Sequence, residues 1–219
     1  GTVRVSGLAL ALQNRQWMYL NGVILVSPTE LGIDSSRPDA DGRTGPLGAA
    51  LRLPYFTATA WYHKKLPDDL QKKYLDQVLS LSEDYAVNQL MAVLAKGNSA
   101  SENEKREAAK NIARFSGISE KAILSYNLDV PTNFFWKELL RDEGYTLGRL
   151  DSRYRGIDKT VAGDRPDYWA ELTSWNHSFA PAVNYYFKNV LKFETDVKYN
   201  LFGPVYPWDW KNNNTGENL

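Results

Sequence analysis

The sequence contains no cysteine and only two histidines among its 219 residues. Without cysteine the chain can form no disulfide bond, and it offers no thiolate as a nucleophile or as a metal ligand. The two histidines, His63 and His177, are far apart and show no ligand spacing such as H-E-x-x-H, so we expect no metal site. We also expect neither histidine to be catalytic, because a catalytic base must face a nucleophile in space.

Net charge and long apolar runs are also lacking. Lysine plus arginine total 26 and aspartate plus glutamate total 26, so the formal net charge is zero. This balance gives no electrostatic signal for nucleic acid or for an anionic membrane. The longest apolar run, residues 22–28, has about seven residues, against the roughly 20 that a transmembrane helix needs. We therefore expect neither a nucleic-acid partner nor a membrane partner.

The first part of the chain has the pattern of a helix followed by a strand. Val5, Leu8 and Leu12 recur at helical spacing, which predicts a helix over residues 2–16. Residues 23–26 form a β-branched run that Pro28 ends, which predicts a buried strand. A single strand leaves its backbone groups unpaired, so the strand implies a sheet formed with other segments. Residues 29–53, rich in Gly, Pro, Asp and Ser, are expected to form a long connection.

From Leu66 onward the pattern is helical. Serine caps, acidic first turns and prolines at first helical positions predict helix starts at Pro67, Ser82, Ser101, Ser119, Pro131 and Pro166. Gly97 is expected to end the helix that starts at Ser82, and a last helix is expected over residues 179–191. The fold class predicted from these patterns is mainly α.

Several long segments resemble the serine carboxypeptidase family of α/β-hydrolases. GTVRVSGLALALQ, residues 1–13, is similar to the helix after the nucleophile in that family's G-E-S-Y-G-T-x-R-x-x-G-L motif, and LNGVILVSP to the strand that follows. LPYFTATAWYHKKLP, residues 53–67, resembles the bacterial branch. The most specific match is KELLRDEGYTLGRLDSRYRGID, residues 137–158. Residues 179–200 and PWDW at 207–210 resemble the segment that returns to the hydrolase core.

The resemblance implies the helical cap, or lid, of an α/β-hydrolase with a remnant core helix and strand. The expected division is core fragment over residues 1–60, helical cap over 61–205, and return to the core with a polar tail over 206–219. In such a protein the nucleophilic serine would precede Gly1, and the catalytic Asp and His would follow residue 219. Ser6 would lie within a helix and not on the nucleophile turn. The chain alone is therefore expected to be inactive, with no catalytic residue of its own.

The family removes C-terminal residues from peptides through an acyl-enzyme intermediate and uses no cofactor. The implied partners are the rest of the hydrolase core and a peptide substrate, and the family suggests a periplasmic or secreted bacterial protein. Two alternatives remain open at this point. The chain could be the cap of a related esterase or acyltransferase, or a stand-alone helical binding module.

Four residues are candidates to line the substrate site: Tyr62 and His63 at the entry to the cap, and Arg149 and Arg153 in the GRLDSRYRG loop. An arginine facing the cleft could bind a peptide's carboxylate through two parallel hydrogen bonds. The alternative is an arginine–aspartate network that only holds the loop. The acidic residues near position 140, with Lys137 and Arg141 beside them, are expected to be a solvated helix surface.

Overall fold

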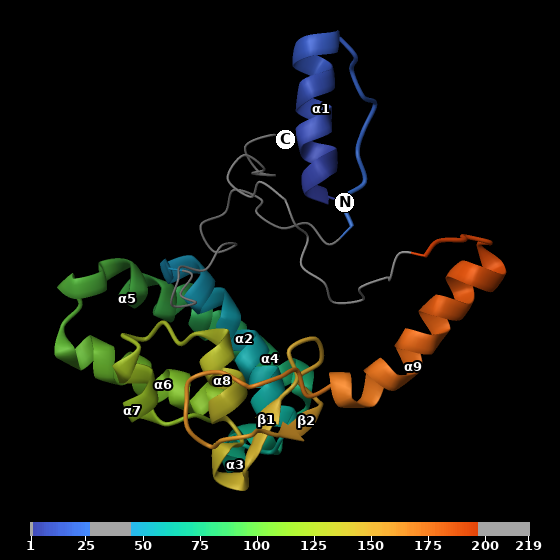
Figure 1. The fold of residues 1–219 in the computed structure, drawn as a ribbon. Coiled ribbons are helices and arrows are strands. Elements are labelled where there is room, and N and C mark those ends of the chain that lie inside the picture. The colour runs from blue at the N-terminus through green and yellow to red at the C-terminus, as the bar shows by residue number, and fades with distance from the viewer. Residues whose placement is uncertain (1, 27–44, 197–219) are drawn as a thin grey trace.

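The computed structural model describes residues 2–26 and 45–196. Those residues form a mainly helical protein with one short two-stranded sheet (Figure 1). The elements before residue 100 are α1 (Thr2–Gln16), α2 (Gly45–Tyr62), α3 (Asp68–Gln71), α4 (Leu75–Tyr85), the π-helix η2 (Ala86–Leu90), α5 (Met91–Lys96) and the 3₁₀ helix η3 (Gly97–Ser99).

The later elements alternate short helices with the sheet. They are α6 (Glu102–Ser116), α7 (Glu120–Ser125), α8 (Thr132–Glu138), the 3₁₀ helix η4 (Arg141–Glu143), β1 (Tyr145–Leu147), β2 (Arg155–Ile157), α9 (Leu172–Tyr185) and the π-helix η5 (Tyr186–Val190). The strands pair antiparallel, with Thr146 opposite Gly156.

Helix α2 lies at the centre of the helical bundle, in contact with α4, η2, α5 and α6. It carries one charged residue, Arg52, so it can be buried on several sides at once. Phe56 stacks on Phe135 of α8 at a ring separation of 3.9 Å. The Thr57 hydroxyl is also buried, and it is satisfied by the Leu53 carbonyl at 2.8 Å and the Ser82 hydroxyl at 2.7 Å.

The helix predicted to start at Ser82 is part of a longer one. Helical structure runs without interruption from α4 through η2 to α5, and Ser82 is fully buried within it. Its hydroxyl bonds Thr57 of α2 and does not cap a helix end. Gly97 ends this helix as predicted, with a φ of 53° that favours glycine.

Three further expectations about local structure were wrong. Residues 23–26 form no strand: Ile24 is 89% exposed, and no described segment pairs with it to complete a ladder. Residues 45–53, expected in a long connection, are the first half of α2. Residues 166–171 are not helical, because this segment is hydrogen-bonded to the end of β2 instead. The Asp158 carboxylate accepts the backbone N–H of Asp167, and the Asp167 carboxylate accepts the backbone N–H of Lys159, each at 2.9 Å.

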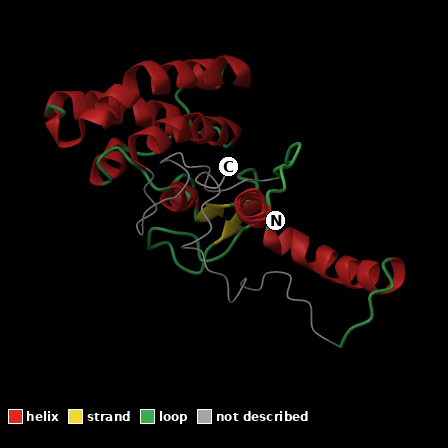
Figure 2. Cartoon of the chain, turned by 90° about the horizontal axis from the view of Figure 1, so that it is seen from above, coloured by secondary structure: helices red, strands yellow, loops and turns green. Residues whose placement is uncertain are grey.

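The first and last described helices project from the bundle. Helix α1 forms where the sequence predicts it, and α9 runs away from the bundle in the views of Figures 1 and 2. No residue of α9 or η5 is buried. None of the described helices is long and apolar enough to cross a membrane. The predicted boundary at residue 60 falls within α2, while residues 27–44 of the connection and the predicted return over 206–219 lie outside the described residues.

Helix α6 begins with the predicted capping box. The Ser101 backbone N–H donates to the Glu104 carboxylate at 2.8 Å, and the Glu104 N–H donates to the Ser101 hydroxyl at 3.3 Å. Lys96, at the end of α5, forms an ion pair with the same carboxylate. The hydrogen bond from Lys96 and then those from Ser101 lower the pKa of Glu104 to about 2. The charged carboxylate therefore ties the end of α5 to the start of α6.

This depressed pKa predicts a specific acid sensitivity. A carboxyl group whose pKa is lower in the folded state stabilises the fold above its unfolded pKa, and loses that contribution as the pH falls through the folded value. Replacing Glu104→Gln should lower stability near neutral pH and flatten its decline between about pH 4.5 and 2. Urea unfolding at a series of pH values measures this effect. Glu107→Gln, an exposed position on the same helix, is the control and should leave the pH dependence unchanged.

Candidate functional site

The loop that joins β1 to β2, residues 148–154, carries the two predicted arginines and is closely held. The Gly148 N–H donates to the Tyr154 carbonyl at 2.9 Å, and the Tyr154 N–H donates to the Asp151 carbonyl at 3.1 Å. A Cβ on Gly148 would lie 2.3 Å from a Glu171 carboxylate oxygen and 2.5 Å from the Asp151 carbonyl. Only glycine fits there, so the loop backbone and Glu171 can approach closely.

Glu171 holds this loop by its backbone. Its fully buried carboxylate accepts the backbone N–H of Leu150 at 2.6 Å and that of Arg149 at 3.1 Å. A buried carboxylate is costly unless hydrogen bonds replace its lost hydration, and these two amides supply them. Because Glu171 directly precedes α9, this contact also sets where that helix leaves the hairpin.

The C-terminal end of α2 also holds the loop, through contacts with Ser152. The His63 Nε2 atom lies 2.8 Å from the Ser152 carbonyl oxygen, which can only accept, so Nε2 carries a proton. The Thr59 hydroxyl lies 2.9 Å from the Ser152 hydroxyl. Tyr62 packs edge-on against the His63 ring, with 5.0 Å between the ring centroids, and half of its surface is exposed.

Arg153 is bound to its own loop. Its guanidinium donates to both carboxylate oxygens of Asp151, Nε at 2.9 and 3.1 Å and a terminal nitrogen at 2.6 Å. The Arg153 hydrogen bond lowers the pKa of Asp151, and the same bond raises the pKa of Arg153, with smaller contributions from Tyr62 and Tyr154. This pair is the arginine–aspartate network that the sequence left as an alternative.

Arg149 is arranged differently. Its guanidinium carbon lies over the ring of Trp169, 4.4 Å from the ring centroid, which is a cation–π contact. An arginine that stacks on an aromatic ring can still donate hydrogen bonds from the N–H groups at its edge. The structure thus brings Tyr62, His63 and Arg153 together around Ser152, whereas the Arg149 side chain lies against Trp169.

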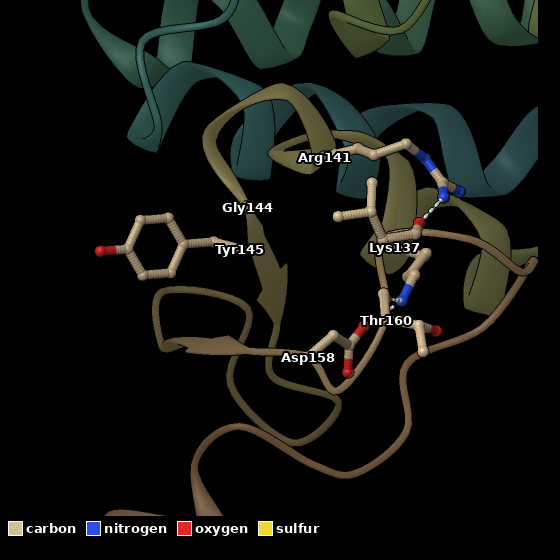
Figure 3. Close-up of a pocket in the computed structure, with 7 residues that line it drawn as sticks. Lys137, Arg141, Gly144, Tyr145, Asp158 and Thr160 are labelled. Atoms are coloured by element: carbon tan, nitrogen blue, oxygen red, sulfur yellow. Dashed lines mark hydrogen bonds and ion pairs between the residues drawn. The ribbon is translucent and has the colours of Figure 1, made fainter.

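A buried ion pair beside the hairpin was not predicted. Lys137 was expected on a solvated surface, but it is 2% exposed and donates to Asp158 at 2.5 Å and to the Thr160 carbonyl at 2.5 Å (Figure 3). Arg141 donates to the carbonyls of Val161 and Gly163. Lys137 and Arg141 therefore form a clamp that holds the loop after β2 by its backbone carbonyls.

The sequence alone gives little indication of this clamp. Lys137 follows Phe134 at a spacing that places both on the buried side of α8, where both residues are indeed buried. Its partner Asp158 is 21 positions away, and no local pattern links the two. The cavity that these residues line is about 20 Å³, room for about one water molecule.

Neither the hairpin nor the clamp has the arrangement of a metal centre. Within the described ranges 2–26 and 45–196, no three His, Asp or Glu side chains are placed to hold a metal ion. The hairpin loop instead presents the two arginines, Arg149 and Arg153, to solvent. Comparison of the chain with protein-family models, with curated proteins and with solved structures finds no match.

The contact between Glu171 and the loop predicts a measurable cost of neutralising it. Glu171→Gln keeps the shape of the side chain but removes the charge that strengthens both hydrogen bonds, and should lower the free energy of unfolding by about 1–2 kcal/mol. The amides of Arg149 and Leu150 should also exchange hydrogen faster. Chemical denaturation and amide exchange measure the two effects. Glu83→Gln, on the exposed side of α4, should change neither; equal effects in both variants would contradict the role given to Glu171.

Proposed function

We propose that the helical bundle with its hairpin is the cap of a serine-carboxypeptidase-like hydrolase. In this proposal the cap covers the cleft and the hairpin loop contacts the C-terminal end of a peptide. The most specific family resemblance, residues 137–158, runs from the end of α8 through η4 and the hairpin, where Lys137 binds Asp158 and Glu171 binds the loop backbone. Support comes from that overlap together with the exposed arginines of the loop and the exposed Tyr62 at the end of α2.

The observation that carries the proposal is the fixed position of Arg149. The loop backbone beneath it is fixed by Glu171, and its guanidinium is oriented by Trp169. An arginine that is oriented before the ligand arrives loses little conformational entropy on binding. Its edge N–H groups match the geometry of a carboxylate, which every unmodified peptide C-terminus provides.

Arg153 has a supporting role in this proposal. One edge of its guanidinium, formed by Nε and a terminal nitrogen, already binds Asp151, so a second carboxylate at that edge would compete with an existing ion pair. Tyr62 and His63 then contribute as walls, since His63 Nε2 is engaged by the Ser152 carbonyl. We therefore assign the carboxylate contact to Arg149 and the maintenance of the loop to Arg153.

The chemistry itself is assigned to other parts of the hydrolase. Ser6 lies inside α1 and is fully buried, which does not suit a nucleophile. His177 and Ser178 are neighbours on the exposed surface of α9, where adjacent side chains point in different directions. In the proposal the serine, its histidine and the oxyanion hole come from the hydrolase core.

Residues 1–219 alone are accordingly expected to be unreactive towards a serine-directed fluorophosphonate. The reason is that a serine attacks such a probe only when a partnered base removes its proton. Intact-mass spectrometry after incubation measures the labelling, and a known serine hydrolase at the same concentration is the positive control. Stoichiometric labelling at Ser6 or Ser178 would show that the chain has catalytic groups of its own.

The carboxylate contact is tested in the hydrolase of this proposal. Arg149→Ala should raise KM for free-acid peptides by about tenfold or more, in line with the contribution of a charge-assisted hydrogen bond. Peptide amides, which carry no C-terminal charge, should be affected much less. Arg165→Ala, an exposed arginine in the loop after β2, is the matched control. Equal losses on acids and amides, with a lowered Tm, would show that Arg149 only supports the loop.

A further inference from the structure

A second site lies at the other end of the bundle from the hairpin (Figure 1). A cavity of about 500 Å³ is formed where the end of α5, the start of α6 and the end of α7 meet. Its size is in the range of small-molecule sites, roughly 300–1,000 Å³, whereas the cavity beside Lys137 holds about one water. Nothing in the proposed cap function uses this end of the molecule.

The floor of the cavity is aliphatic. It is formed by Val93 and Leu94 from α5 and by Leu124 and Leu128 from α7 and the turn after it. Leu94 and Leu128 are almost fully buried, while Leu124 is 38% exposed. An aliphatic group placed here would remove apolar surface from water, which is the main source of affinity for such ligands.

The turn that brings Leu128 into the floor has an unusual backbone. Asn127 and Leu128 are consecutive non-glycine residues with φ values of 50° and 71°, a region that side chains bearing a Cβ disfavour. Hydrogen bonds from their N–H groups to Leu124 and Ile123 carbonyls, at 3.0 and 3.1 Å, hold them there. Such conformations are concentrated at functional sites, because the surrounding structure must maintain them.

The rim of the cavity is cationic. Lys105 and Arg106 lie in the second turn of α6, and Glu102 in its first turn. Lys105 pairs with Glu102 at 3.0 Å; this hydrogen bond lowers the pKa of Glu102, and the charge of Arg106 makes a smaller contribution in the same direction. Two cations and one carboxylate leave one positive charge, next to the positive end of the α6 dipole.

We propose that this cavity binds a small aliphatic carboxylate, with the carboxylate at Arg106 and the hydrocarbon chain over the leucine floor. A cationic ligand is disfavoured by the net charge of the rim. A neutral aliphatic ligand would leave the excess positive charge of the rim unbalanced, and a short anion such as acetate would leave the floor uncovered. The combination of an exposed arginine, which shares Glu102 with Lys105, and an apolar floor therefore selects a ligand with both features.

Titration of the ¹⁵N-labelled chain with octanoate tests the proposal by NMR. Saturable shifts should be confined to the ends of α5 and α7 and the start of α6. Octanol, which has the chain without the charge, and acetate, which has the charge without the chain, should both bind more weakly. Arg106→Gln should weaken octanoate binding about fivefold or more, because it removes a charge-assisted hydrogen bond.

Two further variants complete the test. Leu124→Asn should weaken octanoate binding by altering the floor at its most exposed position, and its unchanged spectrum elsewhere would show that the fold is intact. Lys110→Gln, an exposed cation on α6 outside the cavity, should leave binding unchanged. Shifts spread over the surface, no saturable shifts, or equal weakening by Lys110→Gln and Arg106→Gln would overturn the proposal. The measurement uses no hydrolase activity, so its failure is distinct from failure of the proposed cap function.

Discussion

The burial of α2 is the constraint on which the rest of the structure depends. Leu53 and Phe56 face the core, and the only charge of the helix, Arg52, is neutralised by Asp129. Burial lowers the pKa of Arg52, while the attraction of Asp129 opposes that shift, as expected for a cation that is kept charged in a partly buried position. Since α4, α6 and α8 all pack on this helix, its last turn has a fixed position. Thr59, the exposed Tyr62 and His63 of that end therefore meet the hairpin loop as a rigid group.

Much of the bundle could be predicted from local signals. The capping box at Ser101, the cap at Ser119 and the glycine at position 97 were confirmed because each depends on residues within one turn of helix. The mainly α class follows from the same signals. Ser82 was misassigned for the converse reason: its hydroxyl bonds Thr57, 25 positions away, and no local pattern contains that partner.

The candidate site was predictable in composition but not in its contacts. The arginine-rich loop was identified from the sequence, yet the residue that holds it, Glu171, lies 21 positions beyond Leu150 and was not considered. Lys137 and Asp158 are separated by the same number of positions, which is why Lys137 was expected on a solvated surface. Pairs of this kind depend on which distant segments the fold brings into contact, and a single sequence contains little information about that.

The arginines and lysines of this protein differ in how many of their N–H groups are hydrogen-bonded within the protein. That difference distinguishes the side chains that stabilise the fold from those proposed to bind a ligand. Lys137 and Arg141 direct their donors to a carboxylate and to backbone carbonyls, so a ligand could reach them only by displacing the loop after β2. Arg149 and Arg106 are exposed: Arg149 lies over the ring of Trp169, and Arg106 shares the attraction of Glu102 with Lys105. A cation in that state retains most of its hydration, which a carboxylate replaces at little cost when an apolar surface beside it binds the rest of the ligand. Trp169 supplies that surface for Arg149, and the leucine floor supplies it for Arg106. The two proposed sites, at opposite ends of one bundle, would therefore each select a carboxylate through a different apolar neighbour.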